Sequence, residues 1–138
     1  MNNIDTVSSH LVPDADRMAF TAALFGVDFS IRLEPAVFDI AVRLAPEYNG
    51  GYWQFYGLSN GGFYMAPQSD TIFAVSCENG FEGQLTAEAL GIVTCIYAYS
   101  HLSFSEGTFA EKCAEHYHLL REFVFGHTEV KAILGAID

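Results

Sequence analysis

The sequence predicts an α+β fold: a single compact domain in which a small antiparallel β-meander of three to four strands packs with about five α-helices. Two observations support this. The pairs Asn60-Gly61 and Asn79-Gly80 each separate two short runs rich in aromatic and β-branched residues, the pattern of β-hairpins. Segments with apolar residues at helical spacing occupy both ends of the chain. With 138 residues the chain can close one core, so we expect one domain over residues 1–138.

Two helices are expected before the first hairpin. Asp14 or Asp16 can cap the first, and Gly26 is suited to end it because glycine accepts the positive φ of a helix terminus. Glu34-Pro35 begins the second, since proline at the first helical position loses no hydrogen bond. We expect residues 29–33 to be an extended link and residues 1–12 to be loosely ordered. The apolar face of the first helix consists of Met18, Ala22 and Phe25.

The first hairpin is expected to turn over two residues, Asn60 and Gly61, with positive φ at both. This turn would pair Tyr56 with Met65. A second hairpin follows around Asn79-Gly80, with strands in residues 70–78 and 81–85, and a four-stranded antiparallel meander is the simplest arrangement. The predicted faces of the first hairpin are Tyr52, Gln54, Tyr56, Leu58, Phe63 and Met65 on one side, and Trp53, Phe55, Tyr64 and Ala66 on the other.

The C-terminal half is predicted to be helical. Thr86 caps a helix over residues 87–103, and Gly91 within it indicates close packing against a neighbour. Thr108 and Glu111 predict a capping box at the start of the next helix. The buried stripe of that helix is expected to be Phe109, Cys113, Tyr117, Leu120 and Val124. A last helix begins near residue 128.

The charge excludes some classes of function. The formal net charge is −11, and residues 1–50, 51–100 and 101–138 carry −4, −4 and −3, so the acids are evenly spread. Basic residues do not cluster, which disfavours direct nucleic-acid binding. A solubilising acidic surface is favoured over mimicry of DNA. Duplex DNA carries one charge per about 1.7 Å of its axis, and no run of acids in this sequence approaches that density. Mimicry remains the alternative.

Composition also bears on the compartment. No secretory signal begins the chain and no apolar stretch is long enough to span a bilayer. Three widely spaced cysteines predict reduced thiols and a cytoplasmic location. The mean hydropathy of +0.21 is high, which allows either a monomer or a dimer that shares apolar surface.

No catalytic, cofactor or metal site is predicted. Cys113 and His116 have a spacing that metal ligands can adopt, with His118 and His101 nearby, but no second pair completes a site. We interpret them as a structural thiol and surface histidines. Cys77 falls within a strand, where a thiolate is not stabilised. The glycine pairs at 50–51 and 61–62 lack the lysine of a phosphate-binding loop and are interpreted as turns.

The segment from Pro46 to Pro67, PEYNGGYWQFYGLSNGGFYMAP, resembles the signature of the ArdB/KlcA antirestriction proteins, small factors carried by mobile genetic elements. The resemblance extends over nearly the whole chain. Gly57 is a departure, since a larger residue often occupies this place in the family. Other matching stretches are Leu11-Val12-Pro13, Leu24-Phe25-Gly26, Asn79-Gly80-Phe81, Thr86-Ala87, Gly91-Ile92-Val93, Tyr117-His118, Leu120-Arg121 and Ala136-Ile137-Asp138.

The resemblance implies an inhibitor of type I restriction-modification endonucleases that protects incoming mobile-element DNA and is not an enzyme. The partner it implies is the restriction enzyme, reached directly or through a host factor. The aromatic hairpin and the spread charge favour protein–protein contact over occupation of the enzyme's DNA groove. The candidate contact residues are Asn49, Trp53, Tyr56, Asn60 and Asp138.

Overall fold

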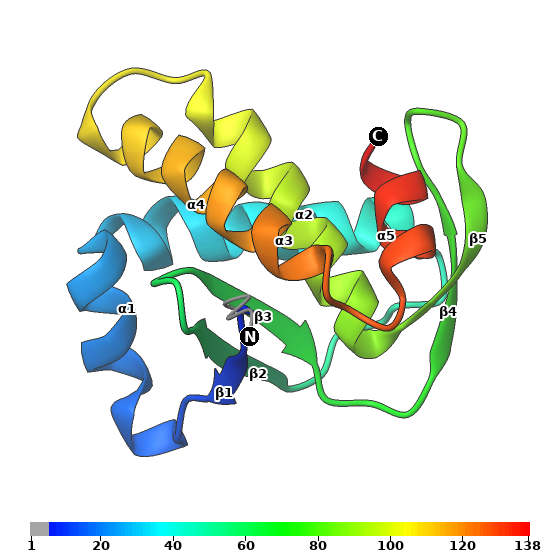
Figure 1. The fold of residues 1–138 in the computed structure, drawn as a ribbon, viewed down its shortest axis with the longest axis horizontal. Coiled ribbons are helices and arrows are strands. Elements are labelled where there is room, and N and C mark those ends of the chain that lie inside the picture. Colours follow the sequence, from blue (N-terminus) through cyan, green and yellow to red (C-terminus); the bar gives the residue numbers. More distant parts are fainter. Residues whose placement is uncertain (1–5) are drawn as a thin grey trace, which may run out of the picture.

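The computed structural model describes residues 6–138. The α+β class is confirmed: helices and two small antiparallel sheets enclose one core (Figure 1). The strands are β1 (Ser9–Leu11), β2 (Trp53–Leu58), β3 (Phe63–Pro67), β4 (Ile72–Ser76) and β5 (Glu82–Thr86). The helices are α1 (Arg17–Phe25), α2 (Glu34–Leu44), α3 (Ala87–Ser103), α4 (Thr108–Val124) and α5 (Val130–Ile137), with the 3₁₀ turn η1 (Asp14–Asp16) and the π-helix η2 (Phe29–Leu33).

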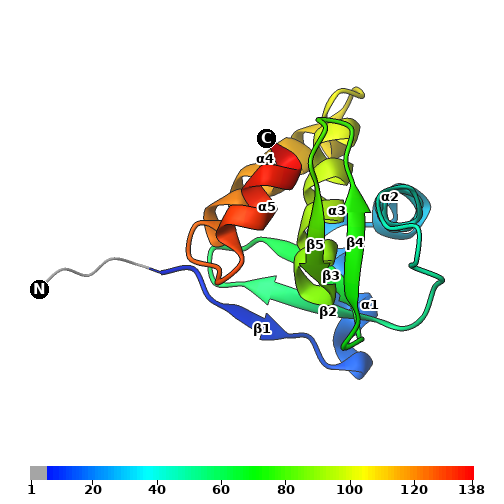
Figure 2. The ribbon, with the colours of Figure 1, turned by 90° about the vertical axis from the view of Figure 1, so that its right-hand side faces the viewer.

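The strands form a β1-β2-β3 sheet and a separate β4-β5 hairpin, whereas the sequence favoured one meander. In Figure 1 the hairpin lies at the right, away from the three-stranded sheet, and in Figure 2 its strands run across the direction of β2. The reason lies at the outer edge of β3, which α3 occupies. The Tyr99 hydroxyl donates to the Phe63 carbonyl at 2.7 Å, and the Met65 amide donates to Cys95 Sγ at 3.5 Å. Side chains of α3 thus take the hydrogen bonds that a fourth strand would otherwise make.

Helix α3 is the centre of the core. It packs against α2, α4, α5 and β3, and in Figure 1 it crosses the middle of the molecule. Its start was predicted correctly: Thr86 Oγ1 accepts a hydrogen bond from the Ala89 amide at 3.2 Å. Its residues from Ala89 to Ile96 are all buried. A helix that is apolar on every side belongs in a core rather than at a surface.

The N-terminal third departs from the prediction in three places. Ser9–Leu11, within the segment expected to be loose, pairs with β2 as β1. Gly57 opposite it makes room, since a Cβ there would lie 2.7 Å from the His10 ring. Residues 29–33 form η2 instead of an extended link, because a helical path lets Phe29 and Leu33 both enter the core. Met18 is 86% exposed and Ala22 is also exposed, so Phe25 is the one residue of the predicted face that α1 buries, together with Thr21.

Two further expectations concern the helices. Helix α2 begins at Glu34-Pro35 as predicted and buries Val37, Ile40, Ala41 and Leu44. The capping box at Thr108 is wrong: the residue before α4 is Gly107 with φ +101°, and its carbonyl accepts from the Glu111 amide at 3.3 Å. Glycine adopts this positive φ without steric cost, whereas a threonine in the same position would be strained.

Candidate functional site

The β2–β3 hairpin is the candidate site predicted from the sequence, and its turn differs from the expected one. Leu58 N donates to Gly62 O and Gly61 N donates to Leu58 O, both at 2.9 Å, and Gly61 has φ +93°. This is a three-residue loop with a bulge at the glycine, and no non-glycine residue from 6 to 138 has positive φ. The extra loop residue shifts the register by one, so Tyr56 pairs with Tyr64 and Phe55 with Met65.

A shift of one residue exchanges the two faces of a strand, so the predicted partition was wrong for β3. Trp53, Phe55 and Gly57 share a face with Pro67, Met65 and Phe63. This face carries the aromatic core: Phe55, Phe63 and Phe29 meet edge-to-face at ring distances of 5.4 to 5.7 Å. Helix α1 and η2 pack on this side through Phe25, which contacts Phe63, and Phe29, which contacts Phe55.

The other face of the hairpin carries a row of rings. Tyr56 stacks on Tyr64 at 4.8 Å, Tyr64 stacks on Phe123 of α4 at 5.6 Å, and Phe123 contacts His127 at 5.8 Å. Tyr56 is half-buried and its hydroxyl donates to Gln54 Oε1 at 3.0 Å. Tyr64 is fully buried, and burial raises the pKa of its phenol well above the usual range. Tyr56 is therefore the member of the row that reaches the surface from β2.

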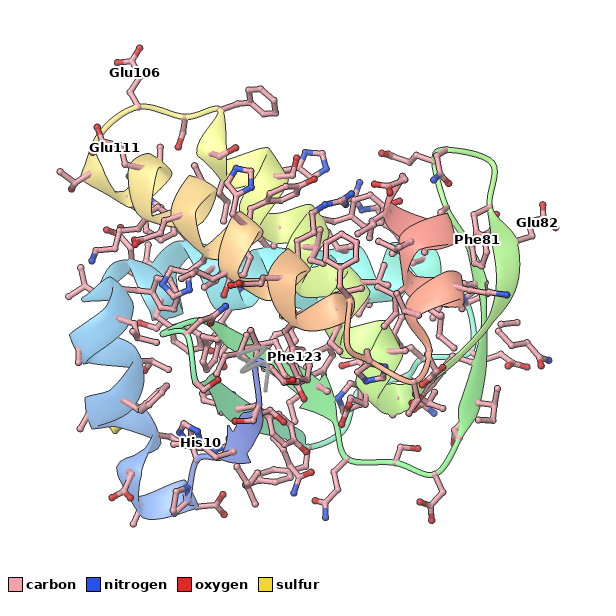
Figure 3. The ribbon with its side chains drawn as sticks, viewed as in Figure 1. His10, Phe81, Glu82, Glu106, Glu111 and Phe123 are labelled. Atoms are coloured by element: carbon pink, nitrogen blue, oxygen red, sulfur yellow. The ribbon has the colours of Figure 1, made fainter. Side chains whose placement is uncertain are left out.

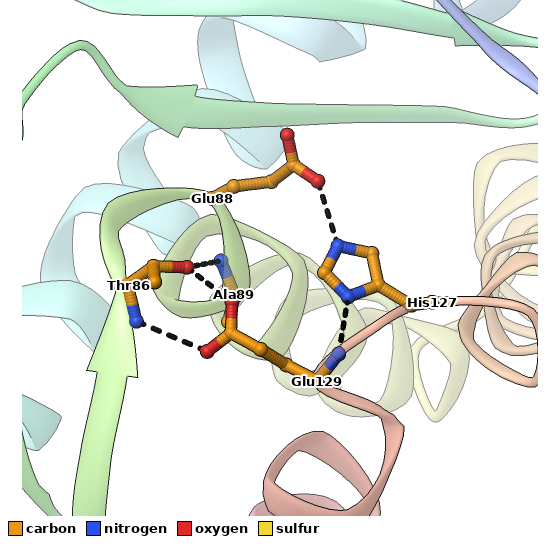
Figure 4. Close-up of polar contacts among 5 residues, drawn as sticks. All are labelled: Thr86, Glu88, Ala89, His127 and Glu129. Atoms are coloured by element: carbon orange, nitrogen blue, oxygen red, sulfur yellow. Dashed lines mark hydrogen bonds and ion pairs between the residues drawn. The ribbon is translucent and has the colours of Figure 1, made fainter.

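The row ends at a polar cluster that the sequence reasoning missed (Figure 4). His127 Nε2 lies 2.6 Å from Glu88 Oε2, and its Nδ1 accepts from the Glu129 amide at 3.0 Å. Glu129 in turn accepts from the Thr86 hydroxyl at 2.5 Å. The cluster joins the start of α3 to the connection between α4 and α5. Both ring nitrogens of His127 are engaged, so the histidine positions helices here.

Trp53, one of the predicted contact residues, is 3% exposed. Its indole Nε1 donates to the Tyr48 hydroxyl at 2.8 Å, and its ring meets Phe38 edge-to-face at 5.3 Å. The Trp53 carbonyl also accepts from the Arg17 guanidinium. The structure thus places Trp53 inside the protein, where it holds α2 and α1 against the hairpin.

Asn60 and Asp138 both attach to α4. Asn60 Nδ2 donates to the Leu119 carbonyl at 2.9 Å and to Glu122 Oε1 at 2.8 Å. Asp138 accepts two hydrogen bonds from Arg121, at 2.8 and 3.2 Å. This pairing lowers the pKa of the Asp138 carboxyl and raises that of Arg121. The structure therefore brings these two predicted residues to one turn of the same helix.

Asn49 lies elsewhere. It is exposed in the connection between α2 and β2, beside Gly50 and Gly51, which both have positive φ. Of the five candidates, then, Asn49 and Asp138 are exposed, Tyr56 and Asn60 are half-buried and Trp53 is buried.

The thiols and histidines considered for chemistry are mostly interior groups. Burial raises the pKa of Cys113 to about 12 and that of Cys95 to about 12. His116, expected at the surface, is 3% exposed between Phe25 and Tyr99, and burial lowers its pKa to about 4. Within residues 6–138 no group of three His, Cys, Asp or Glu side chains is arranged to hold a metal ion. In the same part of the chain, no helix is both long and apolar enough to cross a membrane.

Comparisons with known proteins agree with the fold. A model of the antirestriction protein family matches residues 46–138. The chain is 41% identical over 142 aligned residues to the antirestriction protein KlcA of Escherichia coli, covering all of both proteins. It is also 41% identical to the uncharacterized protein YafX of E. coli K12, over 92% of this chain and 85% of that protein.

A solved structure covers the whole chain with a TM-score of 0.90 and 39% identity. It comes from work on the KlcA and ArdB proteins that describes a novel fold, with antirestriction activity against type I DNA restriction systems in vivo but not in vitro. Since the likeness extends over the full length in both sequence and structure, this chain belongs to the antirestriction protein family.

Proposed function

We propose that this protein inhibits type I restriction-modification endonucleases in the cytoplasm and so protects incoming mobile-element DNA. The observation that supports this most is the full-length likeness, at 39% identity and a TM-score of 0.90, to a structure of a protein group active against type I systems in vivo. A likeness of this extent leaves no part of the chain without a counterpart.

The proposed mode of action is contact with another protein rather than catalysis. The thiols Cys95 and Cys113 are held protonated by burial, and His116 is held neutral. A nucleophile needs the thiolate form and access to its substrate. These groups are therefore suited to packing, and the surface of the protein is left to make the contact.

Mimicry of DNA is the rival, and the net charge of −11 is the observation in its favour. The placement of six of the acids disfavours it. Figure 3 shows Glu106 and Glu111 at one end of the molecule and Glu82 at the other. Three further acids, Asp14, Asp28 and Asp138, lie within 4 Å of Arg17, Arg32 and Arg121. A mimic of the phosphate backbone would need closely and regularly spaced unpaired charges.

The activity of the solved relative in vivo but not in vitro also bears on the mode. A direct competitor for the DNA groove should act on the purified enzyme without other components. We therefore expect this protein to need a component of the cell, either a host factor or an assembled state of the restriction complex.

The contact surface is best tested at the exposed candidates. Asn49→Ala and Asp138→Asn should fold normally and lower the survival of unmodified phage in a host with a type I system. Val42→Ser is a matched control, because Val42 is 59% exposed on α2, outside the hairpin. Survival equal to wild type in both test variants would show that these residues are not part of the contact.

Salt dependence distinguishes the rival. Exposed charge interactions are screened over about 10 Å at 0.1 M salt. If the purified protein inhibits the purified enzyme at low salt, loses this at high salt and competes with DNA, the mimic is correct and the proposal is wrong. Reduced methylation in the cell would point the same way, because a blocked DNA groove stops modification as well.

A further inference from the structure

Three asparagines of this chain, Asn49, Asn60 and Asn79, are followed directly by glycine. Asparagine before glycine is prone to spontaneous deamidation, because glycine has no side chain to hinder the attack of its backbone nitrogen on the asparagine Cγ. The attack needs the backbone to rotate, and it needs the glycine amide to be released from any hydrogen bond. The fold therefore decides which of the three pairs can react.

Asn60 is held most firmly. Its Nδ2 donates to the Leu119 carbonyl at 2.9 Å and to Glu122 Oε1 at 2.8 Å. Its Oδ1 accepts from the Gly62 amide at 3.0 Å. The amide that would have to attack donates to the Leu58 carbonyl at 2.9 Å. Reaction at this asparagine would require the turn to detach from α4 and to open.

Asn79 is held in a loop of the same kind, with fewer contacts. Its Nδ2 donates to the Gly135 carbonyl and its Oδ1 accepts from the Phe81 amide, both at 3.0 Å. The Gly80 amide donates to the Cys77 carbonyl at 3.0 Å. The side chain is exposed, so this turn opens more readily than the turn at Asn60, but it still has to open before the reaction can start.

Asn49 is free of these restraints. Within residues 6–138, neither its exposed side chain nor the Gly50 amide makes a hydrogen bond. Gly50 and Gly51 have φ of +96° and +122°, and a Cβ on either would meet no atom of the described residues within 4 Å apart from its chain neighbours. In Figure 2 the connection between α2 and β2 extends outward at the right of the view. The backbone here has room to rotate.

The ends of this connection are fixed. The Tyr48 amide donates to the Ala45 carbonyl at 3.0 Å, and the Gln68 amide donates to the Tyr52 carbonyl at 2.8 Å. The unrestrained part is therefore limited to residues 49–51. A change of the backbone within these residues can be absorbed without moving α2 or β2.

We propose that Asn49 is a site of spontaneous deamidation in the folded protein, whereas the fold protects Asn60 and Asn79. The Gly50 nitrogen forms a bond to Cγ of Asn49, the bond from Cγ to Nδ2 breaks, and ammonia leaves with the proton of the Gly50 amide. Water then opens the resulting succinimide at one of its two carbonyl carbons, which gives aspartate or isoaspartate. The product carries an additional negative charge. The inference stands whether or not the protein acts on restriction enzymes.

The experiment ages the full-length protein in mildly alkaline buffer and follows each asparagine by peptide mass spectrometry. Trypsin cannot separate the three pairs, because no lysine or arginine lies between Arg43 and Lys112. Pepsin cleaves next to aromatic residues, which lie between the pairs, and its acidic buffer halts deamidation during digestion. We expect conversion of Asn49 to be at least about tenfold faster than that of Asn79, and slowest at Asn60, because hydrogen bonds must break first at both.

Two controls separate the effect of the fold from that of the sequence. In concentrated denaturant the three pairs should react at similar rates, because the hydrogen bonds of the two hairpin turns are lost. Asn49→Gln keeps an amide but would have to close a larger ring. Aged wild-type protein should therefore develop a more acidic species on ion exchange well before this variant does.

The folded protein gives the decisive result. Similar rates at all three asparagines, or conversion of Asn79 before Asn49, would overturn the proposal. The same order and ratio of rates in denaturant would overturn it as well, since the sequence alone would then set them. Circular dichroism and thermal unfolding of the aged protein should match those of fresh protein. Deamidation of Asn49 that appears only together with unfolding would show that the fold protects this residue too.

Discussion

Gly91 of α3 lies directly against Ala66 of β3. A Cβ on Gly91 would be 2.4 Å from the Ala66 Cβ and 2.4 Å from the Met65 carbonyl oxygen. The contact lets α3 approach closely enough for Cys95 and Tyr99 to hydrogen-bond the backbone of β3. The absence of a side chain at Gly91 therefore determines how closely the central helix packs against the edge of the sheet.

Gly91→Ala should destabilise the protein. The added methyl group meets backbone and a neighbouring Cβ, which cannot move aside as a flexible side chain could, so we expect a loss of about 2–3 kcal/mol. Denaturant unfolding followed by circular dichroism measures this. Gly126→Ala is the control, because a Cβ there would have nothing nearer than 3.8 Å. Equal stability of the two variants would show that α3 can shift away from β3.

Asn60→Asp tests the link between the hairpin turn and α4. The substitution replaces the amide donor with an acceptor that faces the Leu119 carbonyl and the Glu122 carboxylate. We expect a loss of about 2–3 kcal/mol, since two hydrogen bonds become repulsions. The free energy of unfolding should recover in part when Glu122→Gln is added, because the glutamine amide can donate to the new carboxylate. If stability does not recover, the contact between Asn60 and Glu122 contributes nothing to the free energy of unfolding.

The lowered pKa of His116 predicts that the free energy of unfolding depends on pH. Its pKa is lowered from 6.5 to about 4 in the folded protein. The unfolded chain therefore takes up a proton near pH 6.5 that the folded chain does not accept until about pH 4. The contribution to stability is full above pH 6.5, declines between pH 6.5 and 4 by at most about 1.4 kcal/mol per pH unit, and is constant below.

His116→Phe should remove this part of the pH dependence. Phenylalanine keeps an aromatic ring between Phe25 and Tyr99 and has no group to protonate. The measurement is the free energy of unfolding of both proteins at several values between pH 4 and pH 7. Carboxylates titrate in both, so the difference between the two curves reports the histidine. Parallel curves would mean that the imidazole accepts a proton while buried.

Trp53→Ala should destabilise the fold by about 3–5 kcal/mol, because it leaves a large cavity and removes the partner of the Tyr48 hydroxyl. Thermal unfolding checks this. A loss of protection by this variant would then reflect unfolding, so it cannot identify a contact residue. A stable Trp53→Ala protein would contradict the buried position of the ring.

The sequence was sufficient for the parts of the fold that depend on local pattern. The start of α3 at Thr86 and the Glu34-Pro35 start of α2 follow from capping and from proline geometry. The close packing at Gly91 was also predicted. The two helix starts depend on a few neighbouring residues, whose effect on the backbone is the same in most surroundings.

The rest depended on contacts between distant residues. An Asn-Gly pair fits both a two-residue loop and a three-residue loop with a bulge, and the choice of the latter moved the whole register of β3. Whether β4 would join β3 depended on Cys95 and Tyr99 of α3, which lie 30 and 36 residues beyond the β3 groups that they contact. Likewise, nothing local distinguishes the exposed Met18 from the buried Phe25.

The same limit applied to the candidate site. Aromatic content identified the β2–β3 hairpin, but it could not show that Trp53 points inward while Tyr56 reaches the surface. The Glu88–His127 pair joins residues 39 positions apart in the sequence, and no sequence motif predicts it. A hollow lined by residues of α1, η2 and β2 could not be predicted either, because only the fold brings these three segments together.

We propose that this protein protects DNA by contact with the restriction machinery and leaves modification largely intact. The most direct measurement is a single infection of a type I restricting host with unmodified phage, with and without the protein, scoring both phage survival and methylation of the progeny DNA. The account predicts higher survival together with methylated progeny. Survival unchanged by the protein, or raised with unmethylated progeny, would contradict it.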